Sequence, residues 1–317
     1  MTERVVVPEA LVASHAQFFG AAGRRWIDGL PGLAAACLER WRLTLDGEPG
    51  FGAVALILPV RCADGTPAVL KLQPVDDETG GEPAALRAWR GHGAVGLLRH
   101  DPDTGSMLLE RLDAGRTLAA IRDDLAALRI LTGIMAGLHA VPVPPGIRRL
   151  GDVAAAMLDR VPHALGTVAD PDERHLIGTC AAVVADLVTE PGDRLLHWDL
   201  HFDNVLATLD DPDRWLAIDP KPLVGDPGFE LLAALHNRWD DVVATADVPR
   251  AVRRRFDLMT EMLGLDRQRA IGWTLARVLQ NALWEAENSD TAWSTEPDRA
   301  IADALLRRTG GTAARAG

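Results

Sequence analysis

Apolar positions near the start of the chain recur at intervals of three and four residues, which is the spacing of an amphipathic helix. Between residues 8 and 42 they fall into two groups, separated by Pro31-Gly32. Each group predicts one helix. The members are Leu11, Val12, Phe18 and Phe19, then Leu33, Cys37, Leu38 and Trp41.

The spacing then changes to that of strands. Residues 53–60 form a continuous apolar run, Asp64-Gly65 is a turn signal, and residues 68–72 are apolar except for Lys71. This order predicts a β-hairpin. In its second strand Leu70 and Leu72 should share one face, while Val69 and Lys71 point to the other.

Helical spacing dominates the rest of the chain. Pro83 opens a predicted helix over residues 83–89, and residues 106–112 are typical of a strand. Apolar positions from Leu118 to Leu138 predict a long helix that ends before the prolines of residues 142–145. Further helices are expected over residues 151–162, 172–189, 228–240, 249–263, 266–288 and 297–309.

This pattern predicts an α+β fold with two lobes. The smaller lobe, residues 1–112, would contain an antiparallel sheet preceded by the helices of residues 8–42. The larger lobe, residues 113–317, would be mainly helical. At 317 residues with 48% hydrophobic residues, the chain is long and apolar enough to build both.

Charge and cysteine content narrow the partners and the compartment. A formal net charge of −12 disfavours nucleic acid or an anionic membrane as the main partner and suits a cationic small molecule, although many soluble proteins are simply acidic. Cys37, Cys62 and Cys180 show no zinc or disulfide pattern, and the first residues form no apolar signal segment. We therefore expect a monomer in the reducing cytoplasm.

The segment from His197 to Asn204 carries the clearest chemical pattern, H-x-D-x-x-x-x-N. Residues 205–218 then predict a short hairpin, and Asp219 follows its second strand. Asp199 can accept the proton of an attacking hydroxyl, while Asn204 and Asp219 offer hard oxygen ligands to Mg²⁺. A loop rich in Asp, His and Asn is also a common solvated turn, and this second interpretation stays open.

Lys71 is the second candidate, because a lysine in an apolar strand needs an anion or an exposed ammonium group. It either holds nucleotide phosphates, with Glu82 or less directly Glu78 as its carboxylate partner, or protects an exposed sheet edge from aggregation. Three glycines within residues 47–52 could form a loop over the phosphates. No G-x-x-x-x-G-K-[ST] pattern occurs, which argues against a P-loop fold.

These pieces, in this order, resemble the protein-kinase-like superfamily, and most closely its aminoglycoside phosphotransferases. Residues 68–71 resemble the strand of the nucleotide-binding lysine, residues 197–204 resemble the catalytic loop, and Ile218-Asp219-Pro220 replaces D-F-G. Over roughly residues 40–290 the chain is similar to the streptomycin 6-phosphotransferases and hydroxyurea-type resistance kinases. The segments that carry this similarity are residues 56–60, 91–95 and 215–231.

The resemblance implies a protein-kinase-like fold and an enzyme that uses ATP, or GTP, with Mg²⁺ to phosphorylate a hydroxyl group. Lys71, steadied by Glu82, would then bind the α- and β-phosphates. The backbone of the hinge strand at Glu110 and Leu112 would hold the adenine, and His197 would brace the catalytic loop.

A streptomycin-like acceptor carries guanidinium groups and calls for an acidic, partly aromatic pocket. Trp198 stands where Gly is usual in this family, and Phe202 and Asp203 stand where the loop often has Gly. A bulky Trp198 could narrow the acceptor side, which affects the identity of the substrate more than the chemistry. The candidates for this acceptor pocket in the helical lobe are Asp226, Trp239, Asp240, Trp284, Glu285 and Glu287. Each of them fits a position in the core or on a solvated face equally well.

Two other functions stay open on the sequence alone. One is a kinase for another small hydroxylated metabolite, which would share the chemistry and differ only in the acceptor pocket. The other is a nucleotide-binding pseudokinase that regulates a partner. A pseudokinase would need a damaged site, whereas Lys71, Asp199, Asn204 and Asp219 are all present.

Overall fold

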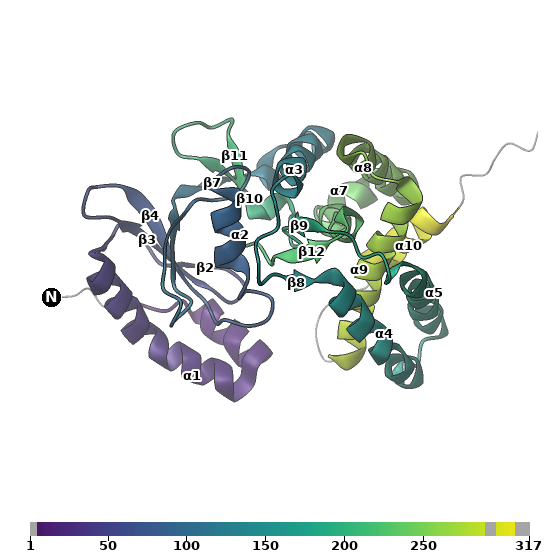
Figure 1. Cartoon of the computed structure of the whole chain (residues 1–317), viewed down its shortest axis with the longest axis horizontal. Helices are drawn as coiled ribbons and strands as arrows, with labels where there is room; N and C mark the ends of the chain where they lie inside the picture. Colours follow the sequence, from purple (N-terminus) through teal and green to yellow (C-terminus); the bar gives the residue numbers. More distant parts are fainter. Residues whose placement is uncertain (1–4, 289–295, 308–317) are drawn as a thin grey trace, which may run out of the picture.

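The structure, a computed structural model, describes residues 5–288 and 296–307 and divides them between two lobes (Figure 1). The smaller lobe contains an antiparallel sheet with the order β1-β3-β4-β6-β5, and β2 pairs with β3. Its strands are β1 (Thr44–Leu45), β2 (Gly50–Phe51), β3 (Leu56–Arg61), β4 (Pro67–Leu72), β5 (Leu97–His100) and β6 (Met107–Glu110).

The predicted hairpin is confirmed, with β3 and β4 paired from Leu56↔Leu72 to Arg61↔Pro67. Its two faces differ as expected. Leu70 and Leu72 pack in a buried cluster with helix α1 (Glu9–Trp41), while Val69 and Lys71 line cavities on the opposite face. The sheet therefore separates a hydrophobic core from a polar site.

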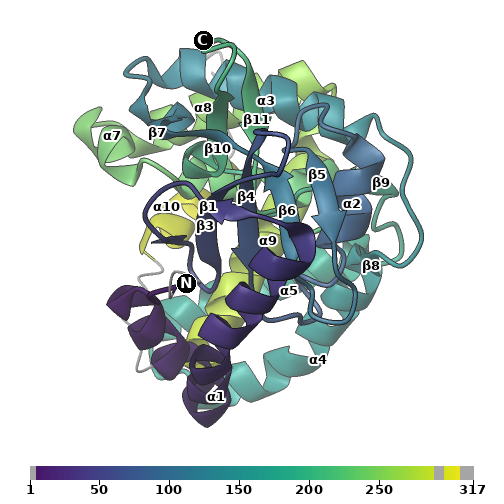
Figure 2. The same cartoon turned by 90° about the vertical axis from the view of Figure 1, so that its left-hand side faces the viewer.

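Helix α1 lies along one side of this sheet (Figures 1 and 2). The prediction of a break at Pro31 is wrong, because the kink is at Gly20, where φ is 54° and ψ is −125°. Glycine adopts such a conformation without steric cost. The helix continues through Pro31 because Leu30 before it and Ala34 after it are both buried against the sheet.

The larger lobe contains most of the helices and two small sheets, ordered β11-β10-β7 and β8-β12-β9. The predicted hairpin of β10 and β11 is confirmed, with Val205 opposite Ala217. The strands are β7 (Leu112–Thr117), β8 (Arg148–Arg149), β9 (Arg194–Leu196), β10 (Val205–Thr208), β11 (Trp215–Ala217) and β12 (Leu223–Gly225). The helices are α3 (Asp124–His139), α4 (Leu150–Thr167), α5 (Pro171–Leu187), α6 (Leu231–His236), α7 (Trp239–Ala244), α8 (Val248–Leu263), α9 (Arg267–Glu287) and α10 (Glu296–Leu306).

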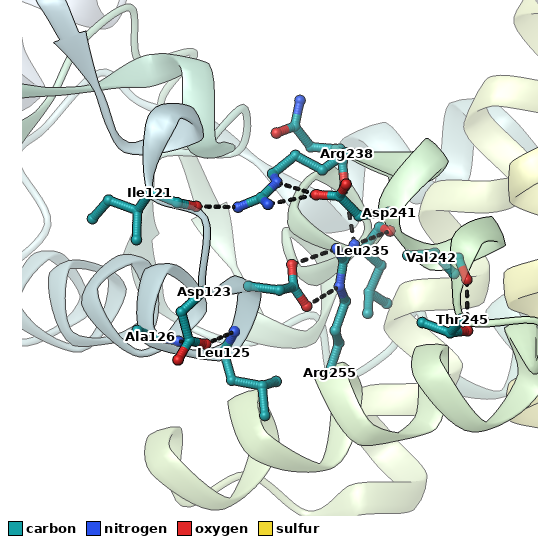
Figure 3. Close-up of polar contacts among 12 residues, drawn as sticks. Ile121, Asp123, Leu125, Ala126, Leu235, Arg238, Asp241, Val242, Thr245 and Arg255 are labelled. Carbon is teal, nitrogen blue, oxygen red and sulfur yellow. Dashed lines mark hydrogen bonds and ion pairs between the residues drawn. The ribbon is translucent and has the colours of Figure 1, made fainter.

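Two predicted helices need correction. The helix expected from Leu118 begins only at Asp124, because residues 112–117 pair with β10 as strand β7 and the side chain of Asp123 caps the helix (Figure 3). The helix expected over residues 228–240 is divided between a 3₁₀ turn, α6 and α7. The break follows from the buried Arg255 guanidinium, which donates to the backbone carbonyls of Leu235 and Asn237.

Helix α2 (Glu82–Trp89) covers the other side of the small sheet and joins the lobes, because the indole of Trp89 donates to the carbonyl of Leu138 in α3. This arrangement places the polar face of β4 opposite the catalytic-loop segment between β9 and β10. Over residues 5–288 and 296–307, no helix is long and apolar enough to cross a membrane.

Candidate active site

Two adjoining cavities, each about 290 Å³, lie between the small sheet and the segments around Asp199 and Asp219. They share Gly52, Lys71 and Asp219. The polar cavity is lined by groups that include Glu82, Asp199, His201, Asn204 and Lys221. The other is mostly apolar, with Ile57, Val69, Val95, Leu109, Leu112, Leu206 and Ile218 in its wall.

Lys71 joins the two lobes. Its Nζ donates to Glu82 Oε1 at 2.7 Å and to Asp219 Oδ1 at 2.7 Å. Burial alone would lower the pKa of Lys71, but the carboxylates of Asp219 and Glu82 raise that pKa above its ordinary value, so the amine stays charged. The alternative of an edge-strand lysine is wrong, because β4 lies between β3 and β6.

The catalytic-loop segment is anchored by His197. This imidazole is buried and donates from Nε2 to the carbonyl of Ile218, at 2.9 Å. Burial lowers the pKa of His197, so the ring is neutral at pH 7. The contact ties the loop to Ile218, which lies between the end of β11 and Asp219.

Asp199 faces the polar cavity, and its Oδ2 lies 3.3 Å from the Nζ of Lys221. Burial alone would raise the pKa of Asp199, but the charge of Lys221, followed by those of His201 and Arg277, holds this pKa below its ordinary value. The carboxylate is therefore ionised at neutral pH and able to accept a proton.

Asn204 and Asp219 suit a divalent cation whose remaining coordination positions are filled by a bound nucleotide. The Nδ2 of Asn204 donates to the backbone carbonyl of Asp199 at 2.9 Å, so the amide orientation is set with its oxygen as the available acceptor. Within residues 5–288 and 296–307, no cluster of three or more His, Cys, Asp or Glu would hold a metal alone. One carboxylate and one amide beside a cavity of about 290 Å³ match Mg²⁺, which takes part of its ligand shell from nucleotide phosphates.

The hinge segment forms one wall of the apolar cavity, to which both Glu110 and Leu112 contribute. The Glu110 N–H donates to the carbonyl of Gly96, and its Oε2 accepts from the Gly96 N–H. The Glu110 side chain therefore holds the neighbouring segment in place, and any contact to a base would come from the remaining backbone groups.

The proposed acceptor residues do not gather at these cavities. Asp226 caps the turn at Gly228 and pairs with Arg269 Nε at 2.6 Å, so its carboxylate is already used structurally. Trp239 packs partly against the core and Asp240 is exposed on α7. On α9, Trp284 and Glu285 are at least partly exposed, and neither lines either cavity. Glu287, also on α9, pairs with Arg160 at 2.6 Å.

Three residues that sequence reasoning missed support the site. Gln73 donates to Glu82 Oε2 at 2.6 Å, and Glu230 accepts from the backbone N–H of Trp198 at 2.8 Å. Lys221 contacts Asp199. Gln73 and Lys221 each lie two positions after a predicted site residue, which is the available sequence signal. Glu230 had none, because its partners are distant in sequence.

Residues 40–289 match the family described as aminoglycoside/hydroxyurea antibiotic resistance kinase. The chain belongs to this family. It is 57% identical over 288 residues to the streptomycin 6-kinase of Streptomyces glaucescens, covering 91% of this chain and 93% of that one. It is also 53% identical over 310 residues to the hydroxyurea phosphotransferase of Kitasatospora aureofaciens, covering 96% and 87%.

Solved structures confirm the predicted protein-kinase-like fold. A choline/ethanolamine kinase family protein from Mesorhizobium loti aligns with a TM-score of 0.59 at 17% identity, over 84% of this kinase and 90% of that chain. The ethanolamine kinase of Plasmodium vivax aligns with a TM-score of 0.56 at 12% identity, over 92% and 90%. At these identities the similarity concerns the fold.

Proposed function

We propose that this kinase transfers the γ-phosphoryl group of ATP, with Mg²⁺, to the 6-hydroxyl of streptomycin or a closely related aminoglycoside. The observation that carries the chemistry is the 2.7 Å contact between Lys71 and Asp219, which are 148 residues apart in sequence. It brings together a cation of one lobe that would bind phosphate and a carboxylate of the other lobe that would bind the metal. The pseudokinase alternative lacks support, since all four groups meet at one cavity.

The residues divide the work of phosphoryl transfer. Lys71, oriented by Glu82, would bind the α- and β-phosphates, and the base would enter the apolar cavity beside Leu112. Asn204 and Asp219 would hold Mg²⁺, which supplies neutralisation of the triphosphate charge. Asp199 would orient the acceptor hydroxyl and take its proton as the oxygen attacks the γ-phosphorus in line.

The acceptor is inferred from relatives. A second streptomycin 6-kinase, from Streptomyces griseus, is 52% identical over 306 residues, covering 96% of this chain and 99% of that one. The hydroxyurea phosphotransferase is equally similar and makes hydroxyurea the second candidate acceptor. Use of ATP and the presence of free thiols at Cys37, Cys62 and Cys180 favour the cytoplasm, and the monomeric state stays a prediction.

The test is a comparison of acceptors with the purified protein, ATP and MgCl₂. Streptomycin, hydroxyurea, kanamycin and choline are incubated separately, and mass spectrometry detects the gain of one phosphoryl group. We expect streptomycin to be modified, with ¹H–³¹P correlation placing the phosphate at the 6-oxygen. Modification of hydroxyurea or choline without streptomycin would reject the proposed acceptor but keep the kinase chemistry.

The assignment of Asp199 is tested by Asp199→Ala. Loss of a general base should lower kcat by about 10²- to 10⁴-fold, while ATP affinity changes little because the triphosphate contacts of Lys71 remain. Steady-state kinetics gives kcat, and a fluorescent nucleotide titration gives the dissociation constant for ATP. A variant that keeps wild-type turnover would overturn the assignment.

A further inference from the structure

The chain uses lysine very sparingly. Of its 33 Lys and Arg residues only Lys71 and Lys221 are lysine, and both line the same polar cavity. Lys71 is held by Glu82 and Asp219. The ion pairs of Lys71 with Glu82 and Asp219 do not explain why Lys221 lies on the Asp199 side of the cavity.

The backbone presents Lys221 in a defined direction. Pro220 and Pro222 flank it, which restricts the backbone of the segment. The Lys221 N–H donates to the carbonyl of His197 at 3.0 Å, so the base of the side chain is tied to the catalytic loop. A long side chain with a fixed origin loses less conformational freedom on binding a ligand.

The Lys221 ammonium lies among acidic groups that leave it partly open to solvent. Its Nζ is 3.3 Å from Asp199 Oδ2 and 3.7 Å from Glu78 Oε2, and 37% of its side chain is exposed. An ion pair with this exposure contributes at most about 1 kcal/mol to folding. Stability alone therefore gives little reason for a cation here.

Positive charge gathers around Trp198, the residue that precedes Asp199. The guanidinium carbons of Arg277 and Arg148 lie 4.5 and 4.8 Å from the ring centre of Trp198, the residue next to Asp199. Lys221 Nζ is 5.8 Å from the same ring. Of these three cations, Lys221 is the one that lines the polar cavity together with Asp199.

Resting on the proposed function, we infer that Lys221 is a catalytic residue whose ammonium binds the non-bridging oxygens of the γ-phosphoryl group during transfer. The acceptor oxygen forms a bond to phosphorus while the bond to the β-γ bridging oxygen breaks. The hydroxyl proton passes to Asp199, and Lys221 remains protonated throughout. Lys71 would hold the α- and β-phosphates, so each lysine serves a different part of the triphosphate.

Kinetics of Lys221→Met separate this role from a structural one. Loss of one charge aimed at the transition state should lower kcat by about 10²- to 10³-fold and leave the dissociation constant for ATP within about twofold. Arg267→Met is the matched control, because Arg267 forms a similarly exposed ion pair with Asp257 away from the cavity. A Lys221→Met kcat within twofold of that control would overturn the inference.

A labelling experiment on the unaltered protein does not depend on the acceptor. An acyl phosphate of ATP carries a carbonyl on its γ-phosphate, and a neighbouring amine attacks it: a C–N bond forms, the C–O bond breaks, and ATP leaves. We expect acylation of Lys221, blocked by excess ATP and read by peptide mass spectrometry. Labelling of Lys71 alone would reject the inference even if streptomycin is phosphorylated; labelling of Lys221 without streptomycin turnover would reject only the acceptor.

Discussion

Trp198 occupies a backbone position that suits glycine better than tryptophan. Its φ is 67°, in the left-handed region, which costs a residue with a side chain about 1–2 kcal/mol. Its ring is nevertheless buried, stacks 6.5 Å from Phe229 and contacts Arg148 and Arg277. The packing of the indole therefore outweighs the strain, and the usual Gly at this position has a conformational reason.

Replacing Trp198 by Gly and by Ala separates the two effects. Both variants lose the ring and should be destabilised by about 3–5 kcal/mol. Gly relieves the left-handed strain and Ala does not, so Trp198→Gly should be about 1 kcal/mol more stable than Trp198→Ala. Urea denaturation measures the difference. An Ala variant at least as stable as the Gly variant would contradict the strain argument.

The residues of the candidate site differ in how well their positions could be predicted from the sequence. Asp199 and Asn204 could be grouped from the sequence, because they are five residues apart in one loop, whereas Lys71 and Asp219 are 148 residues apart and were linked through the family resemblance. The role of Asp226 could not be predicted, because the partner that neutralises it, Arg269, is 43 residues away. An acidic side chain in sequence looks the same whether it meets a ligand or a buried arginine.

The same limit applies to whole elements. Apolar runs separated by turn residues were sufficient to predict both hairpins, since the register of a hairpin depends on local pairing. The division between α6 and α7 was not visible, because it depends on Arg255. This guanidinium also pairs with Asp124 in α3, and Arg238 beside it donates to the carbonyl of Ile121 (Figure 3).

Helix α1 contacts the loop between β2 and β3, which lines the polar cavity. Ser14 Oγ donates to the carbonyl of Ala53 at 2.6 Å, and His15 Nε2 donates to that of Val54 at 2.9 Å. Ala53 and Val54 line the polar cavity. The His15 ring is fully buried and stacks 4.6 Å from Trp26, so the contact has a rigid base although most of α1 precedes the family match.

Removing these two hydrogen bonds should weaken nucleotide binding. His15→Phe keeps an aromatic ring against Trp26, and Ser14→Ala keeps the helix; each loses one bond, worth about 0.5–1.5 kcal/mol. We expect the KM for ATP to rise about two- to tenfold per variant, with kcat nearly unchanged. Thr44→Val, which loses a bond to Arg61 on the same sheet, is the control. An effect on kcat alone would count against a positioning role.

The two lobes share a buried core, although the small lobe also has a second cluster between α1 and its sheet. One buried cluster contains Trp89 and Met107 of the small lobe together with Leu138 and Phe202 of the large lobe. The backbone adds to this continuity, because Ala217 donates to the carbonyl of Gly93 and accepts from the N–H of Val95. A division at residue 113, as the sequence pattern suggests, would expose this cluster.

This continuity predicts cooperative unfolding of the whole molecule. Calorimetry should show one transition with equal calorimetric and van't Hoff enthalpies, although chains of this length often unfold in steps. Mg²⁺-ATP at about 100 times its dissociation constant should add about 2.7 kcal/mol to the free energy of unfolding. The temperature of the single transition should rise accordingly. A fragment of residues 1–112 should show no cooperative transition, because Trp89 and Met107 lose their partners. Two resolved transitions, with only one shifted by nucleotide, would show instead that each lobe folds on its own core.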